Sequence, residues 1–276
     1  MKNAPEGKRK LHRSPLAIVA TAIVALAVGG SAFFLSQDEA PDPGEDLCWS
    51  LVSPEQSPES GPLEECGDKL ETSMTGRSAG QAAPQQAHRH SPEQVRITER
   101  VITTYAESEA AAIPEEIRQN LANALTHYSY DVFDILGIDV DFSDPDFSTT
   151  PNNLDVSAEI LREFLLKLAS DPGAFSAVYS SQHERIVQRI GTLTRADFTS
   201  TPTGTTDKAV GVMRESGRAT GILFSIASET SPGDTEYGWP RLRNAIANQA
   251  EEVGVHEGRR LQNLFREAEK SFNDWS

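Results

Sequence analysis

The chain has 276 residues, a formal net charge of −16 at pH 7, and a hydrophobic share of 38%. This length is enough for one or two domains, and the hydrophobic share is below the roughly 45–50% that is usual for a compact globular protein. Part of the chain is therefore expected to lie outside a core, and the acidic charge argues against a nucleic-acid-binding function.

An uncharged apolar run from Leu16 to Leu35 predicts a transmembrane helix over residues 15–36. A helix of about 20 residues spans the roughly 30 Å hydrocarbon core of a bilayer. Five basic residues and one acidic residue precede the run, and acidic residues follow it. Because a basic flank stays in the cytoplasm, residues 1–14 are expected to be a cytoplasmic tail and the rest of the chain to lie outside the cytoplasm.

A cleaved signal peptide is the competing interpretation of this run. Its apolar region would normally be about 7–15 residues long, which is shorter than the run observed. The one plausible small-x-small cleavage site, Gly30-Ser31-Ala32, would leave three apolar residues on the new N-terminus. A retained single-pass anchor is therefore the favoured prediction.

Residues 37–91 predict a disordered extracytoplasmic stalk, because they contain six prolines, polar tracts and few apolar residues. An exception surrounds Cys48 and Cys66, where Trp49 and several leucines indicate a small loop. Both cysteines would lie where disulfides persist, and a bridge closing this loop would contribute about 3 kcal/mol in the chain-entropy model. Two free thiols are the alternative. His88 and His90 are expected to belong to a solvated part of the stalk.

From Ser91 onwards, apolar residues recur at helical spacing and predict about six to seven helices over residues 92–276. The expected helices begin at Pro92, Pro114, about Asp155, Pro172, Asp207 and Pro240, with a last amphipathic stretch through Leu264 to Trp275. No alternating strand pattern of comparable length occurs. The predicted fold class is therefore all-α: a helical bundle ectodomain on a stalk with one N-terminal transmembrane helix.

Two features of this ectodomain predict how its helices pack. Gly217 and Gly221 are four residues apart in one predicted helix, a spacing that indicates close approach of a neighbouring helix. The last stretch places five apolar residues on one face, which predicts a core helix: Leu261, Leu264, Phe265, Phe272 and Trp275. Docking of this face into a partner's groove, or onto a membrane, is the alternative.

The segment EFLLKLASDPGAFSAVYSSQHERI, residues 163–186, resembles a helical domain of unknown function in actinobacterial proteins. The later GRATGILFSIASE, residues 217–229, is similar to the helix that follows in that domain. The resemblance covers roughly residues 154–253. It implies an association with WXG-type, or type VII, secretion and supplies no functional residues. The chain departs from that setting because none of its three tryptophans is followed by x-Gly.

Two histidine-glutamate pairs and one acidic loop are the candidate metal sites of this sequence. His183-Glu184 and His256-Glu257 each begin like a zinc-protease helix, but Val187 and Arg260 stand where the second histidine would be needed. An acidic loop offers clustered carboxylates for calcium, at Asp139, Asp141, Asp144 and Asp146. It lacks the glycine and glutamate of a calcium loop, so a solvated connection is the favoured interpretation.

The sequence contains no nucleophile elbow and no glycine-rich phosphate loop. No catalytic, cofactor-binding or metal-ligating residue is therefore predicted, and no small-molecule ligand is inferred. We expect a membrane-anchored extracytoplasmic module that acts through protein–protein contact. The alternative is a cell-envelope enzyme such as a cell-wall hydrolase. A deep pocket with converging carboxylates would favour the enzyme, and a shallow surface with exposed apolar side chains would favour the binding module.

Overall fold

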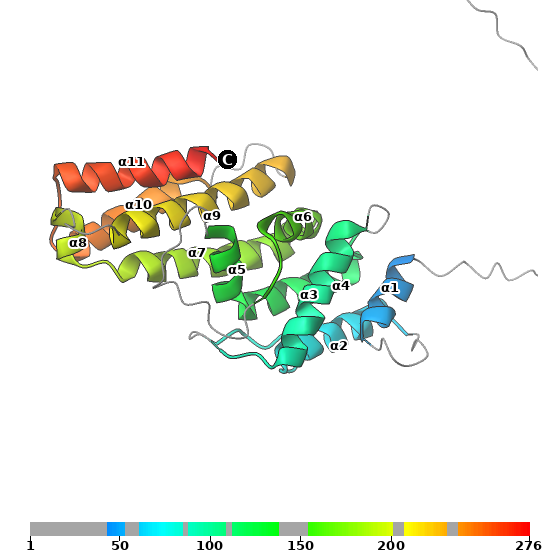
Figure 1. Ribbon diagram of the computed structural model, residues 1–276. Helices are drawn as coiled ribbons and strands as arrows, with labels where there is room; N and C mark the ends of the chain where they lie inside the picture. The colour runs from blue at the N-terminus through cyan, green and yellow to red at the C-terminus, as the bar shows by residue number, and fades with distance from the viewer. Residues whose placement is uncertain are drawn as a thin grey trace, which may run out of the picture. The chain divides into compact units, whose positions relative to one another are not determined.

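The computed structural model describes residues 43–52, 61–84, 88–108, 112–137, 154–200, 207–230 and 237–276 (Figure 1). These residues form eleven α-helices and no strand, which confirms the predicted all-α class. The helices are α1 Pro43–Val52, α2 Leu63–Thr75, α3 Pro92–Glu107, α4 Glu115–His127, α5 Ser129–Gly137, α6 Ala158–Leu168, α7 Pro172–Gly191, α8 Arg195–Thr199, α9 Lys208–Thr230, α10 Trp239–Glu252 and α11 Arg259–Asn273. All of them belong to one compact unit, Pro41–Ser276.

Three sequence-based predictions fall outside the described residues. They are the cytoplasmic tail over residues 1–14, the transmembrane helix over residues 15–36, and the acidic loop that contains Asp139 to Asp146. Within the ranges that the structure describes, no helix combines the length and the apolar character that a membrane crossing requires.

The predicted stalk over residues 37–91 is wrong for much of its length, because it contains α1 and α2. Leu70 and Met74 of α2 are fully buried, as is Cys48 of α1. The prolines that suggested a stalk lie at helix starts, where a missing N–H is tolerated: Pro43 is the first residue of α1, and Pro62 precedes α2. The folded region therefore begins near Pro43 and not near Ser91.

Helix starts that the sequence predicts are confirmed at two caps. The Ser91 hydroxyl accepts from the backbone N–H of Gln94, whose side chain accepts from the Ser91 N–H, and Pro92 is the first residue of α3. Asp171 accepts from the N–H groups of Gly173 and Ala174 at the start of α7. Each cap satisfies backbone donors that a helix leaves without partners.

The helix predicted to begin at Pro114 is interrupted at Tyr128, so that α4 and α5 are two helices. The Tyr128 side chain is fully buried, and its hydroxyl donates to the carbonyl oxygen of Met74 at 2.7 Å. This tertiary bond fixes the residue at the break, and it could not be inferred from periodicity. The five-residue α8 was also not predicted, although Thr194 and Asp197 form a capping box at its start.

Helix α11 lies alongside α9, as Figure 1 shows. Leu264 and Ala268 of α11 are fully buried, which confirms that this helix is part of the core. The backbones approach closely at Gly217 and Gly221, where an added Cβ would meet the carbonyl oxygens of Ala268 and Phe272. Trp275 is an exception to the predicted apolar face, because 46% of it is exposed and its ring lies 4.2 Å from the Arg218 guanidinium.

Cys48 and Cys66 join α1 to α2, with their Sγ atoms 2.04 Å and their Cα atoms 6.3 Å apart. Both cysteines are fully buried, and Trp49 beside them donates from its indole N–H to the carbonyl oxygen of Gly61 at 3.0 Å. The bridge therefore ties a helix of only ten residues to the rest of the unit. A helix this short is marginal without such support.

We expect Cys48 and Cys66 to resist thiol labelling in the mature protein under denaturing, non-reducing conditions. Replacing both cysteines by serine should lower the free energy of unfolding by about 3 kcal/mol, because the unfolded chain loses its closed loop. Mass spectrometry after alkylation checks the first expectation and urea denaturation the second. Labelling of both thiols would show that the bridge does not form in the cell.

Candidate functional site

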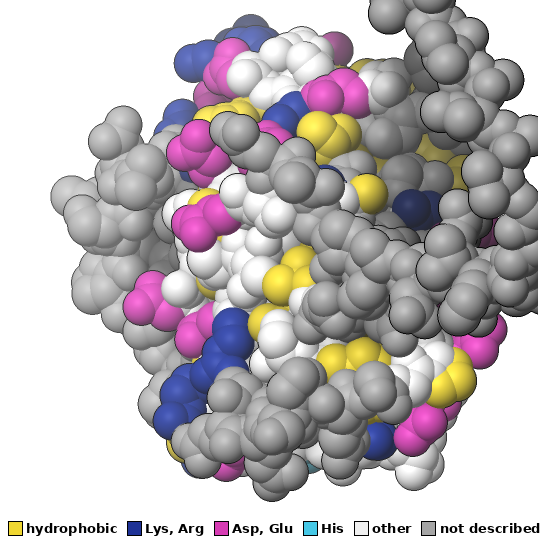
Figure 2. Space-filling view, turned by 90° about the vertical axis from the view of Figure 1, so that its right-hand side faces the viewer, with side chains coloured by type: hydrophobic (Ala, Val, Ile, Leu, Met, Phe, Trp, Pro, Cys, Tyr) yellow, Lys and Arg dark blue, Asp and Glu magenta, His cyan; other side chains and the backbone are white. Residues whose placement is uncertain are grey.

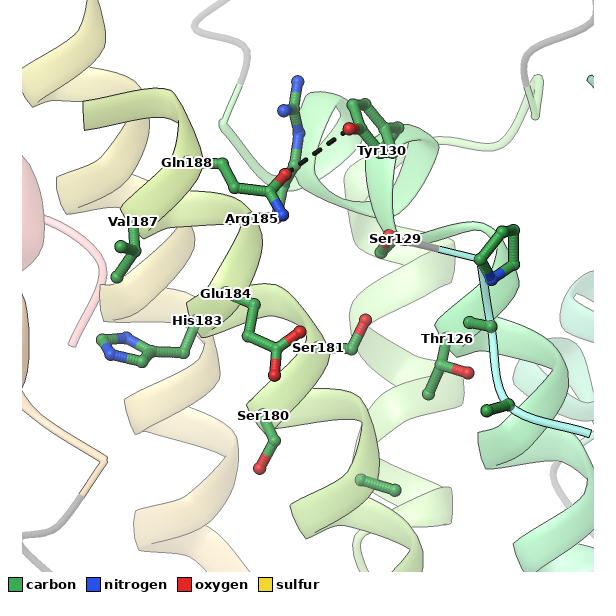
Figure 3. A pocket seen from close by; sticks show the side chains of 14 residues that line it. Thr126, Ser129, Tyr130, Ser180, Ser181, His183, Glu184, Arg185, Val187 and Gln188 are labelled. Atoms are coloured by element: carbon green, nitrogen blue, oxygen red, sulfur yellow. Dashed lines mark hydrogen bonds between the residues drawn. The ribbon is translucent and has the colours of Figure 1, made fainter. Parts of the chain in front are cut away.

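A surface depression of about 860 Å³ lies over the outer face of α7 (Figure 3). Its walls come from three parts of the chain: α7, the junction of α4 and α5, and residues 82–84, which follow α2. On the face of the molecule seen in Figure 2, acidic and basic side chains of the described residues are interspersed.

Helix α7 presents one face to the core and the other to the depression. Phe175, Val178 and Ile186 are buried, whereas Ser180, Glu184 and Val187 are exposed. Buried Gln182 donates from its side-chain amide to the carbonyl oxygen of Ser129 at 3.2 Å. This bond holds the start of α5 against α7.

The far end of the depression is closed by Tyr130. Its hydroxyl donates to the side-chain oxygen of Gln188 at 3.4 Å, and the Arg185 guanidinium lies 3.7 Å from its ring centroid (Figure 3). Because Arg185 is engaged with this ring, its charge is directed away from the centre of the depression. Glu184 makes no ion pair with another described residue, and Figure 3 shows its carboxylate near Ser181.

Helices α5, α7 and α9 share a group of half-buried charged side chains: Asp134, Arg185, Arg189 and Glu215. Glu215 accepts from the Arg189 guanidinium at 3.2 Å. Burial raises the pKa of Glu215 and of Asp134, and the neighbouring Arg189 and Arg185 partly offset this rise. Because these opposite charges offset one another between the helices, we infer that they serve helix packing.

A second, smaller depression of about 200 Å³ lies between α7 and α10. His183 and Val187 line both depressions, so they form a ridge between them. Val187 is 44% exposed. Burial and the nearby Arg241 lower the pKa of His183 to about 4, so this imidazole is neutral at pH 7. We call the two depressions and their ridge the α7 groove.

The structure separates the two His-Glu pairs that the sequence singled out. His183 and Glu184 lie on the α7 groove, while His256 and Glu257 lie in the connection between α10 and α11 and are exposed. Within the described ranges, no group of three or more His, Cys, Asp or Glu side chains is arranged to hold a metal ion.

The expectation that His90 is solvated is wrong, because only 3% of this residue is exposed. Its ring stacks on Tyr128 with centroids 3.7 Å apart, and its Nε2 lies 3.2 Å from the carbonyl oxygen of His127. His127 is also buried, and its Nε2 lies 3.0 Å from the carbonyl oxygen of Gln81. These histidines therefore fix the segment that leads into one wall of the α7 groove.

Comparison with known proteins finds no matching family model, no matching curated protein and no matching solved structure. The resemblance of residues 154–253 to an actinobacterial secretion-associated domain therefore stays a prediction.

Proposed function

We propose that this protein is a binding module, and that the α7 groove receives an extended segment of a protein partner. The observation that carries this proposal is the groove itself, which is open and runs across the outer face of α7. Its walls combine methyl groups, from Ala82, Ala83 and Ala177, with the hydroxyls of Ser129 and Ser180. Such a mixture suits the alternating apolar and backbone polar groups of a peptide.

The charge of the larger depression favours a partner segment that carries Lys or Arg, whereas the smaller depression is lined by both Arg241 and Glu252. Glu184 is exposed in the groove, His183 is neutral at pH 7, and the Arg185 charge lies against Tyr130. The chain after residue 36 carries 20 basic and 40 acidic residues, since five of the 25 basic and one of the 41 acidic residues precede it. This acidic field would speed the encounter with a basic partner.

We place this binding at the outer side of a cell membrane, with residues 15–36 as the anchor. The charge asymmetry around the apolar run supports this location, and the resemblance of residues 154–253 supports a link to type VII-type secretion. N-terminal sequencing of the membrane fraction tests the anchor, since a mature chain starting at Phe33 or later would rule it out.

The groove is tested by placing a photo-crosslinking amino acid at position 180 in intact cells. The matched control carries it at Gln262, an exposed position on α11 outside the groove. We expect position 180, but not position 262, to cross-link to a protein segment that contains Lys or Arg. Glu184→Lys should reduce this product about tenfold, because it places a positive charge opposite the basic segment.

Three results would contradict the proposal. Equal products from positions 180 and 262 would indicate contact by collision. If the yield of the cross-linked product is the same in Glu184→Lys as in the wild type, charge does not contribute to the binding of the segment. Release of soluble fragments from cell-wall polymer by the purified protein would favour the hydrolase instead.

A further inference from the structure

We propose that His90 and His127 form an acid-sensitive clamp that holds residues 81–84, one wall of the α7 groove, against the junction of α4 and α5. This inference concerns regulation of the groove and rests on the proposed function for its biological consequence. The clamp itself is argued from the geometry of the two side chains.

Hydrogen bonding determines the tautomer of both histidines. Each Nε2 faces a backbone carbonyl oxygen, of His127 for His90 and of Gln81 for His127. A carbonyl oxygen only accepts, so each Nε2 must carry the proton and donate it. The two bonds form a chain that runs from His90 through His127 to Gln81.

This tautomer leaves both Nδ1 atoms without their protons. Both atoms are buried and have no hydrogen-bond partner among the described residues. Protonating either ring would therefore bury an N–H donor without an acceptor, together with a positive charge. Each change favours a state in which the ring reaches water.

The charged groups around His90 and His127 also disfavour protonation of the two rings. Arg77, which follows α2, and His88 each lower the pKa of both rings. The one acid that acts in the opposite sense on His127 is Glu71 of α2. Its carboxylate already accepts from the Gly80 N–H at 2.7 Å and the Asn120 amide at 3.0 Å.

Burial is the largest cause of the shift and lowers the pKa of His90 from 6.5 to about 4. The closed state therefore binds this proton less readily than the opened state. Its stability is constant above pH 6.5 and falls as the pH drops from 6.5 towards 4. For His90 alone, the opened fraction should rise about 20-fold between pH 7 and pH 5. Burial lowers the pKa of His127 too, which adds to the effect.

Two half-buried acids on α5 titrate in the opposite sense. Burial raises the pKa of Asp131 to about 7, and burial also raises that of Asp134. Protonation of these carboxyls is easier in the folded state, so they stabilise it as the pH falls. An experiment must therefore isolate the histidines by substitution.

The clamp reaches the groove through both of its ends. Gln81 precedes Ala82, Ala83 and Pro84, which line the groove. The His90 ring lies flat on Tyr128, the residue at the break between α4 and α5. Acidification is thus expected to release one wall of the groove while the α9–α11 packing stays in place.

Hydrogen exchange of the full chain in detergent micelles, at pH 7 and pH 5 and corrected for intrinsic exchange, tests the clamp. We expect the opening of residues 78–83 to increase about 20-fold at pH 5, with no change in the interior of α9. His90→Gln and His127→Gln keep an N–H donor for the same carbonyl but do not titrate, so each should shrink this increase. His256→Gln, on an exposed loop, is the matched control and should behave like the wild type.

The clamp is overturned by any of three results: unchanged opening of residues 78–83 in the wild type, an increase that both glutamine variants retain, or an equal increase throughout α9 and α11. If the glutamine variants do not fold, NMR titration of the histidines in the wild-type protein tests the clamp instead. His90 and His127 must then titrate below 6.5 together with the Gln81 amide. No partner enters these measurements, so failure of the clamp and failure of partner binding are distinguishable.

Discussion

A chain that begins at Ser91 is expected to lose its cooperative thermal unfolding, whereas a chain that begins at Pro41 should retain it. The shorter chain lacks α1 and α2, although it keeps every helix that the sequence predicted for the ectodomain. Helix α2 packs against α3 and α4, so its removal would expose their buried faces. The near-ultraviolet circular dichroism of the two chains, followed with temperature, measures the difference.

The expected loss is large because the missing part is well buried. Trp49, Leu70 and Met74 are each at most 2% exposed, and burial of three such side chains contributes about 5–9 kcal/mol. Tyr128 would also lose the Met74 carbonyl oxygen that accepts from its buried hydroxyl. A domain is typically stable by only about 5–15 kcal/mol, so this loss removes much or all of its stability.

Binding of a hydrophobic dye provides the control measurement. The chain from Ser91 should bind it strongly and the chain from Pro41 weakly, because only the first exposes the α3 and α4 faces. Equal melting temperatures for the two chains would contradict the packing of α2 and restore the boundary at Ser91.

Periodicity predicted those helices whose burial is decided by their own apolar stripe. In α6, α7 and α11 the inward residues recur every three or four positions, and Ser91 and Asp171 cap helices where the sequence places them. In α1 and α2 the stripe is short and interrupted by charge. What holds these helices is a disulfide and contacts with residues some 50 positions away, which no local pattern contains.

The α7 groove was even harder to predict from the sequence than α1 and α2. Its walls come from residues 82–84, from the region of Thr126 to Tyr130, and from α7 and α10. The sequence did single out His183 and Glu184, but for a zinc motif whose second histidine is missing. Stacking of His90 on a tyrosine 38 positions away gave no sequence signal either, since both histidines of the clamp stand next to polar residues.

Replacing both Gly217 and Gly221 by alanine is expected to lower the free energy of unfolding by about 2–6 kcal/mol, at about 1–3 kcal/mol for each overpacked site. At Gly221 the new Cβ would lie 2.5 Å from the carbonyl oxygen of Phe272, and at Gly217 it would meet that of Ala268. Real Cβ atoms essentially never come within 3.0 Å of such an atom, and the oxygens belong to backbone. Helix α11 must therefore move away from α9 as a whole.

Gly211→Ala is the matched control, because Gly211 lies in the same helix and nothing stands within 4 Å of its added Cβ. That change should stabilise the protein by up to about 1 kcal/mol, since alanine favours the helix more than glycine does. Urea denaturation of the chain from Pro41 measures all three variants. An unchanged midpoint in the glycine pair would mean that α11 is not seated on α9 at this distance. The apolar face of α11, with Leu261, Leu264 and Phe272, would then be available to dock into a partner's groove. In that case α11, and not the α7 groove, would be the preferred candidate for the partner-binding surface.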